Sequence, residues 1–194
     1  MSTFQFKIQI SGITKPPVWR RLTVPASYSF YDFHMAIQVA FGWYNSHLFE
    51  FSPKGFGSEP SIQQIFDDQM DFGDVDPIDA NTIKLSKIFK KEKQKFTYIY
   101  DFGDGWEHII TLEKIFPGKT KLPALLAGKG RCPQEDCGGI WGYAEMKEAL
   151  NDPDHPEYEE YAEWLGMAEG ETWDATAFNI ETHRESIKKV FNKQ

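Results

Sequence analysis

The sequence predicts an α+β protein, because its strand-like and helix-like segments are grouped along the chain rather than alternated. The expected order is strand, strand, helix, strand, a short element, two more strands and then helices. A helix that packs across a mixed or antiparallel sheet after the first two strands resembles a β-grasp arrangement. The C-terminal helices would cover an edge or the other face of this sheet. With 194 residues and no long linker, residues 1–194 are expected to form a single domain.

The first two strands are predicted from alternating apolar and polar residues. Residues 4–10 have this period of two, and residues 18–24 resume it after a break that is rich in glycine and proline. The second strand contains Trp19, Arg20 and Arg21, which could form a stacking and phosphate-binding patch. The favoured interpretation is an edge strand whose charged residues discourage pairing with other chains and whose tryptophan anchors it.

The first helix has clear signals at both ends. Ser29 is a suitable N-cap, Asp32 follows at the capping-box position, and Gly42 is suited to end the helix. His34 lies beside the apolar stripe and is expected to be a hydrogen-bonded helix histidine. The apolar face is formed by Phe30, Phe33, Ile37, Ala40 and Phe41.

The centre of the chain is a predicted β-hairpin over residues 98–113. Asp104-Gly105 separates two β-rich runs and favours a two-residue type I′ turn, in which both central residues need positive φ. This turn would set Asp101 opposite His108, and directly opposed side chains lie about 5 Å apart at Cβ. The sequence therefore predicts a carboxylate beside an imidazole near the turn.

The segments around the hairpin contain more loop. Residues 47–51 form a predicted strand, and residues 52–81 a solvated loop whose five aspartates (67, 68, 71, 74 and 76) do not match an EF-hand. A long irregular connection is expected from Ile115 to Gly139. Three helices follow: a short one after Trp141, one from Pro156 to Gly166, and a last one capped by Asp174.

The charge of the chain is uneven. Its net charge is −8, and the stretch from Cys132 to Asp174 contains 13 acidic residues and one basic residue, Lys147. This composition disfavours broad binding to nucleic-acid phosphates, which needs a positive surface. No apolar run approaches the ~18 residues of a membrane span, and the N-terminus lacks a signal-peptide layout. Two cysteines do not make a disulfide framework, so a cytoplasmic setting is expected.

Asp101 and His108 form the first candidate site. A carboxylate can orient an imidazole and raise its basicity, as a general base requires, although a structural pair at the hairpin end is the favoured interpretation. Glu135 and Asp136, in a later cysteine-containing loop, could join Asp101 and Asp104 around magnesium or manganese if that loop folds over the hairpin.

Cys132 and Cys137 form the second candidate site. Their spacing could supply half of a zinc site, completed by His108 or His155, but a second cysteine pair is missing. Buried or capping cysteines are therefore favoured. No residue is assigned as a metal ligand, and no cofactor is identified.

Several motifs together are specific enough to indicate a family. They are Pro16-Pro17-Val18-Trp19-Arg20-Arg21-Leu22; the helix from Phe33-His34 to Gly42-Trp43; His47-Leu48-Phe49-Glu50-Phe51; Tyr100-Asp101-Phe102-Gly103-Asp104 with Trp106 and His108; Pro133-Gln134-Glu135-Asp136-Cys137-Gly138-Gly139 with Gly142-Tyr143; and Asp152-Pro153 with His155-Pro156-Glu157. This set resembles the plasmid pRiA4b ORF-three-like family, which is found on plasmids and as a passenger of insertion elements. The usual Pro-Pro-Glu-Asp of the family is Pro-Gln-Glu-Asp here, so Gln134 departs from the pattern without removing a carboxylate. The resemblance implies a single α+β domain and an intracellular setting, and it implies no substrate.

The main functional hypothesis is a binding or interaction module with an acidic, aromatic-lined cleft near the hairpin turn. The cleft would be lined by Asp101, Asp104, Trp106, His108, Glu135 and Asp136. Its ligand would be a cation or a basic protein segment, because the local charge is negative. The first alternative is a metal-assisted hydrolase of phosphoester or nucleic-acid substrates, with His108 as its base. The second is DNA association through Arg20, Arg21 and Lys188-Lys189, which the overall acidity argues against.

Overall fold

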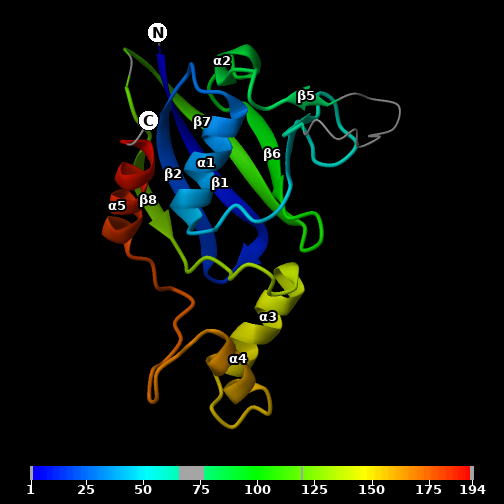
Figure 1. Cartoon of the computed structure of the whole chain (residues 1–194), viewed down its shortest axis with the longest axis vertical. Helices are drawn as coiled ribbons and strands as arrows, with labels where there is room; N and C mark the ends of the chain where they lie inside the picture. Colours follow the sequence, from blue (N-terminus) through cyan, green and yellow to red (C-terminus); the bar gives the residue numbers. More distant parts are fainter. Residues whose placement is uncertain (1, 66–76, 119, 193–194) are drawn as a thin grey trace.

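The computed structural model of the chain describes residues 2–65, 77–118 and 120–192, and within them eight strands form one sheet (Figure 1). The strands are β1 (Ser2–Thr14), β2 (Pro17–Pro25), β3 (Phe49–Ser52), β4 (Ile62–Gln63), β5 (Ile78–Asp79), β6 (Lys95–Tyr100), β7 (Trp106–Pro117) and β8 (Ala124–Lys129). The helices are α1 (Phe30–Phe41), α2 (Leu85–Ile88), α3 (Gly139–Leu150), α4 (Tyr158–Trp164) and α5 (Ile180–Phe191). The predicted α+β class is confirmed.

The sheet has the order β5-β4-β3-β6-β7-β1-β2-β8 and is mixed, since β4 and β5 are parallel whereas its other neighbours are antiparallel. The expectation that residues 18–24 form an edge strand is wrong, because β8 pairs with β2 and occupies that edge. β8 itself lies in the stretch predicted to be irregular. Its sequence, Ala-Leu-Leu-Ala-Gly-Lys, has no β-branched residue, so the partner strand rather than local propensity makes it a strand.

Helix α1 lies across one face of the sheet, after the hairpin of β1 and β2, in the predicted β-grasp-like arrangement (Figure 1). The side chain of Ser29 accepts the Asp32 N–H at 3.0 Å, and the Asp32 carboxylate accepts the Ser29 N–H at 2.9 Å. This is the predicted capping box. Gly42 ends the helix at a φ of 89°, a left-handed conformation that glycine adopts without strain.

Aromatic rings fill the core between α1 and the sheet. The ring centroid of Phe6 lies 4.7 Å from that of Phe33 and 4.8 Å from that of Phe89. Each such side chain removes about 150–250 Å² from water, so these rings dominate the hydrophobic stabilisation. His34 belongs to this core: it is fully buried, and its Nδ1 lies 2.8 Å from the Tyr98 hydroxyl. His34 therefore has the hydrogen-bonded role that was predicted.

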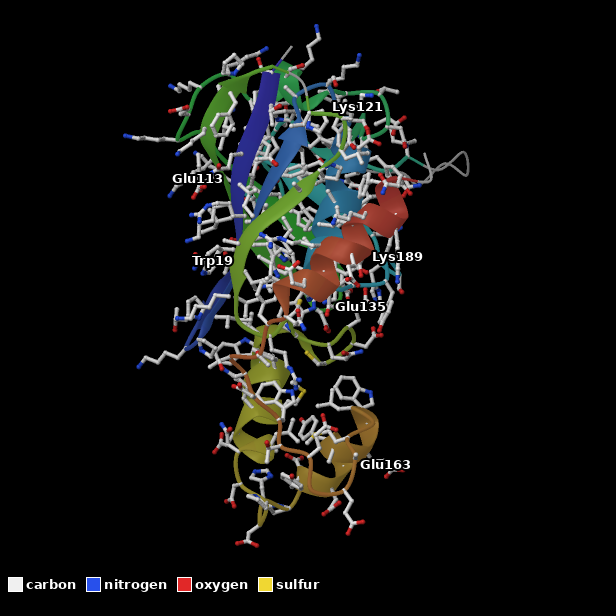
Figure 2. All side chains as sticks on the ribbon, turned by 90° about the vertical axis from the view of Figure 1, so that its left-hand side faces the viewer. Trp19, Glu113, Lys121, Glu135, Glu163 and Lys189 are labelled. Carbon is white, nitrogen blue, oxygen red and sulfur yellow. The ribbon has the colours of Figure 1, made fainter. Side chains whose placement is uncertain are left out.

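The C-terminal helices occupy two places. Helices α3 and α4 pack together beyond one end of the sheet, and α5 packs beside β8 and α1 (Figures 1 and 2). The expectation that Asp174 caps the last helix is wrong. Asn179 is the N-cap, and its side chain accepts the N–H groups of Glu181 and Thr182. Asp174 instead accepts the Thr176 N–H at 2.7 Å in a turn.

The five loop aspartates between residues 66 and 76 lie outside the described residues. Around them, the segment predicted as a loop contributes the two-residue strands β4 and β5 to the sheet. Among the helices that the structure describes, none combines the length and apolar character needed to cross a membrane.

Candidate functional site

The hairpin of β6 and β7 forms where it was predicted, but with a different turn. His108 lies opposite Tyr98, and residues 101–105 make the loop. The expectation that Asp101 faces His108 is therefore wrong. Gly105 has the expected positive φ of 66°, but Asp101 also has a positive φ of 57°, and its carbonyl accepts the Gly105 N–H at 2.6 Å. This bond closes a five-residue loop in place of the two-residue turn.

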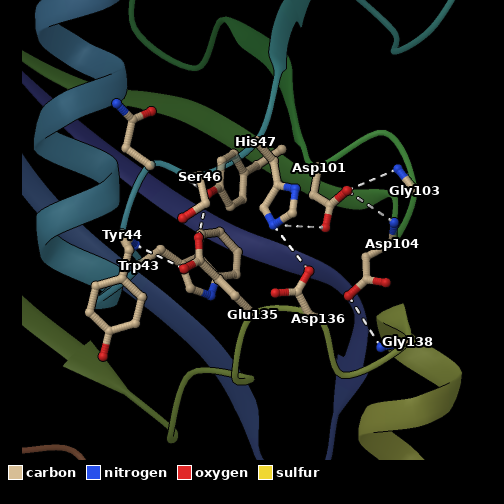
Figure 3. Close-up of polar contacts among 12 residues, drawn as sticks. Trp43, Tyr44, Ser46, His47, Asp101, Gly103, Asp104, Glu135, Asp136 and Gly138 are labelled. Carbon is tan, nitrogen blue, oxygen red and sulfur yellow. Dashed lines mark hydrogen bonds and ion pairs between the residues drawn. The ribbon is translucent and has the colours of Figure 1, made fainter.

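The Asp101 carboxylate organises this loop (Figure 3). Its Oδ1 accepts the N–H of Gly103 at 2.9 Å and the N–H of Asp104 at 3.3 Å. The backbone N–H of Asp101 donates to the Leu48 carbonyl at 2.9 Å, which ties the loop to the chain entering β3. The other oxygen, Oδ2, lies 3.7 Å from Nε2 of His47. One oxygen thus holds the turn while the other faces a neighbouring segment.

Trp106 and His108 point into the core, and both are fully buried. The His108 ring packs edge-on against Phe41 and Trp43, with centroids 5.1 Å and 5.2 Å away, and its Nδ1–H donates to the Trp106 carbonyl at 2.9 Å. Burial lowers the pKa of His108 to about 4, so the imidazole is neutral at neutral pH. Trp106 and His108 therefore present no surface to a ligand in this structure.

Glu135 attaches the loop between β8 and α3 to the aromatic core. Its side chain is 7% exposed. The carboxylate accepts the Tyr44 N–H at 3.1 Å and the hydroxyl hydrogen of Tyr100, whose oxygen in turn accepts the Ser46 N–H at 2.9 Å. Burial, followed by this bond to Glu135, raises the pKa of Tyr100 well above its usual range. Glu135 thus lies near the other predicted residues but has its own partners inside the protein.

A second attachment joins the hairpin turn to the start of α3. Oδ2 of Asp104 accepts the Gly138 N–H at 3.2 Å (Figure 3). Gly139 has a φ of 67°, and a Cβ there would lie 2.4 Å from the Asp104 carbonyl oxygen. Glycine is therefore required for this close approach. The cysteine-containing loop folds against the hairpin through backbone contact as well as through side chains.

His47 is the residue of this region that the sequence analysis did not select. Its Nε2 lies 3.2 Å from Oδ1 of Asp136 and 3.7 Å from Oδ2 of Asp101 (Figure 3). Among the described residues, these three form a group of possible metal ligands whose donor atoms all lie within 4.8 Å of one another. Asp101 and Asp136 thus meet, as was considered, but through a histidine from the chain before β3.

The two cysteines are free thiols in the same loop. Burial raises the pKa of Cys132 far above its usual range and that of Cys137 to about 12, so both remain protonated at neutral pH. Neither cysteine belongs to the group of possible metal ligands found among the described residues. The arrangement gives no support to zinc bound by Cys132 and Cys137.

A groove of about 820 Å³ lies between α3 and α4, and residues of the loop that precedes α3 also line it. Trp141 of α3 is 77% exposed and Trp164 of α4 is 45% exposed. The lining residues are Asp136, Cys137, Gly138, Trp141, Gly142, Glu145, Glu157, Glu160, Tyr161, Glu163 and Trp164. The set contains five carboxylates and neither lysine nor arginine. Figure 2 shows Glu163 on α4, well away from the sheet.

Residues 2–182 match the sequence profile of the family described as "Plasmid pRiA4b ORF-3-like protein". The chain belongs to this family. It is 39% identical over 196 residues to "Uncharacterized protein y4hQ" of Sinorhizobium fredii, and this match covers 99% of the chain and 94% of that protein. It is also similar to the crystal structure of the protein of unknown function MM3350 from Methanosarcina mazei Go1. That match has a TM-score of 0.77 and 36% identity, and it covers 93% of this chain and 96% of the other.

Two arginines of β2 were considered as a nucleic-acid contact in this pRiA4b ORF-3-like protein. Arg20 is fully buried: its guanidinium donates to the carbonyls of Ala40 and Gly130, at 2.9 Å and 3.1 Å, among others. Arg21 donates two hydrogen bonds to the Glu113 carboxylate, at 2.6 Å and 2.8 Å. Both guanidinium groups therefore have partners within the protein.

Proposed function

We propose that this pRiA4b ORF-3-like protein is a binding module that captures a basic segment of another protein in the groove between α3 and α4. The observation that carries the proposal is the composition of the groove: five carboxylates, neither lysine nor arginine, and two exposed tryptophans. Such a surface attracts positive charge and disfavours acidic partners. Of the six residues predicted to line a cleft, only Asp136 lines this groove.

Tyr161, which lines the groove, lies in the negative field of the nearby carboxylates. Burial raises the pKa of the Tyr161 phenol, and the nearby carboxylates of Glu157, Glu145 and Glu160 raise it further. The same carboxylates would favour an ammonium or guanidinium group over a neutral one. Every residue that lines the groove belongs to the acidic stretch from Cys132 to Asp174, which has a single basic residue.

The tryptophans add a contact that carboxylates cannot make. A Lys or Arg side chain over an indole face gains about 0.5–1 kcal/mol when exposed and about 2 kcal/mol when desolvated. Trp141 and Trp164 come from different helices and both line the groove, so a segment lying along it could place a cationic side chain near each. Because the groove has a volume of about 820 Å³ and is lined by residues of two helices, a peptide segment suits it better than a single small cation.

The test uses a fluorescent peptide that carries several Lys and Arg residues separated by Gly and Ser. Its anisotropy is titrated with the purified chain, and a peptide with Glu in place of the basic residues serves as the comparison. We expect saturable binding of the basic peptide only, and weaker binding at high salt, since exposed charges are screened. Trp141→Ala should weaken binding about tenfold, corresponding to about 1.4 kcal/mol.

The chain offers matched controls for both kinds of contact. Tyr44 is 75% exposed and lies outside the groove, so Tyr44→Ala should leave binding unchanged. Glu159 and Glu163 are exposed residues of α4, but only Glu163 lines the groove. Glu163→Lys should therefore weaken binding more than Glu159→Lys. The proposal would be contradicted if Glu163→Lys and Glu159→Lys weakened peptide binding equally, or if Trp141→Ala bound the peptide as tightly as the unaltered chain.

The hydrolase alternative receives less support in the form first considered. Its general base was to be His108, which is fully buried among Phe41, Trp43 and Tyr98. A base must reach the proton that it abstracts within about 3 Å or through one water molecule.

DNA association would depend on Lys188 and Lys189 of α5, because Arg20 and Arg21 are engaged within the protein.

A further inference from the structure

Three segments that are distant in the sequence bring metal-binding side chains to one point at the end of the sheet. His47 lies just before β3, Asp101 begins the loop between β6 and β7, and Asp136 lies in the loop before α3. Nε2 of His47 is 3.2 Å from an oxygen of Asp136 and 3.7 Å from an oxygen of Asp101 (Figure 3). Ligand atoms held about 2.0–2.2 Å from one tetrahedral zinc ion lie about 3.3–3.6 Å apart. The three donor atoms here lie within 4.8 Å of one another, so side-chain movements would complete the geometry.

One of the carboxylates is already oriented. Oδ1 of Asp101 is held by the N–H groups of Gly103 and Asp104, which leaves Oδ2 directed at His47. The hydrogen bond from the Asp101 N–H to the Leu48 carbonyl fixes the spacing between the hairpin loop and the residue that follows His47. Contacts of this kind, which orient ligands from outside the metal's own coordination sphere, are a regular feature of metal centres.

The hydrogen bonding of His47, whose side chain is 27% exposed, gives a further indication of a missing partner. Its Nε2 is buried, and among the described residues it has no hydrogen-bond partner of acceptable geometry. The atom nevertheless lies between two carboxylate oxygens. In the described part of the chain, the ion pairs of Asp101 and Asp136 are with His47 alone, and no lysine or arginine pairs with either. A divalent cation would bind the imidazole nitrogen and offset both negative charges.

We infer that His47, Asp101 and Asp136 bind a divalent transition-metal ion, with zinc as the best fit. One imidazole and two carboxylates suit zinc, whereas calcium and magnesium prefer oxygen ligands throughout. The Asp136 side chain is 71% exposed, so the ion would face solvent. Three protein ligands leave at least one position for water or another ligand, as in open rather than structural zinc sites. The inference is independent of the proposed function, although Asp136 also lines the groove.

The experiment measures zinc binding by the full chain after treatment with EDTA and return to chelator-free buffer. Isothermal titration calorimetry should give one zinc ion per chain, and calcium and magnesium should bind far more weakly. Cobalt should bind at the same site, with visible absorption but without the intense near-ultraviolet bands of thiolate ligation. His47→Ala and Asp136→Ala should each weaken zinc binding by about 100-fold or more.

Control variants distinguish this site from zinc binding elsewhere on the chain. His155→Ala and the Cys132→Ser, Cys137→Ser double variant should bind zinc like the unaltered chain, and so should Trp141→Ala, which removes a groove contact. Asp136 is exposed, so Asp136→Ala removes no buried contact; alanine at its positive φ of 63° adds some backbone strain, and circular dichroism would verify that the variant folds. Absence of zinc binding would mean that the three side chains form only a structural contact, and the inference would fail. Undiminished binding by His47→Ala and Asp136→Ala, loss in the cysteine variant, or calcium binding as tight as zinc binding would also overturn it.

Discussion

Mild acid should destabilise this protein because two histidines are buried in their neutral form. His108 is fully buried, and its Nδ1–H donates to a backbone carbonyl among aromatic rings. His34 is also buried, with Nδ1 at 2.8 Å from the Tyr98 hydroxyl and Nε2 at 2.6 Å from Oδ1 of Asn45. Burial is the main reason that the pKa of each histidine is lowered to about 4.

The size of the effect follows from the difference between the folded and unfolded pKa values. An unfolded histidine titrates near pH 6.5, so between about pH 6.5 and pH 4 the unfolded chain binds more protons than the folded chain. The free energy of unfolding therefore falls as the pH falls through this range. With folded pKa values of about 4, lowering the pH from 7 to 5 costs about 2 kcal/mol for each histidine, or about 4 kcal/mol for His34 and His108 together.

The assay is urea unfolding at pH 7 and pH 5, in EDTA so that no metal bound at His47 contributes. The variant His108→Phe replaces the buried imidazole with a ring of similar size and should lose about half of the pH effect, whatever its absolute stability. His155→Gln, at a histidine outside the buried core, should keep all of it. Equal stability of the unaltered chain at the two pH values, or the full decrease in His108→Phe, would refute this reasoning.

Three further substitutions test the packing around the site. Arg20→Leu should lower the free energy of unfolding by about 3–5 kcal/mol in urea, because it leaves buried carbonyls such as that of Ala40 without a donor, and Arg20→Lys should not restore it. Arg21→Met should cost no more than about 1 kcal/mol, since Arg21 and Glu113 are both partly exposed; a larger loss would mean that this pair is coupled to the core. Gly139→Ala should speed hydrogen exchange in residues 131–139 while leaving β1 protected, because its Cβ would meet the Asp104 carbonyl oxygen at 2.4 Å.

Local signals predicted the parts of the fold that local forces determine. The capping box of Ser29 and Asp32, with Gly42 after the last turn, sets both ends of α1 without any distant contact. The strand β8 was not predicted because it depends on pairing with β2, more than 100 residues earlier in the chain. The predicted register of the central hairpin was wrong because a contact with a distant segment also determines it. The positive φ of Asp101 widens the loop, and a hydrogen bond to Leu48 helps to hold Asp101 in place.

The candidate site was predictable only in part, because it too depends on contacts between distant segments. Asp101 and Asp136 were selected by their chemistry, but His47 joins them only because β3 pairs with β6, and that pairing brings the start of β3 to the hairpin loop. No turn signal links these two strands, because more than 40 residues separate them in the chain. The groove was also not predicted, because the helical pattern around Trp141 does not show that this residue is 77% exposed and lines a groove together with residues of α4.

The adjacent acids Glu135 and Asp136 explain how one short loop can contribute to both proposals. Glu135 turns inward, where the Tyr44 N–H and the Tyr100 hydroxyl hold it. Asp136 has a φ of 63°, a left-handed conformation that turns the chain, and its exposed side chain lies beside His47 and lines the groove. The inward carboxylate fixes the loop, and the outward one faces His47 and the groove, where both proposals use it. Consequently, a substitution at Glu135 should disturb zinc binding and peptide binding together, whereas His47→Ala should affect zinc alone and Trp141→Ala should affect the peptide alone.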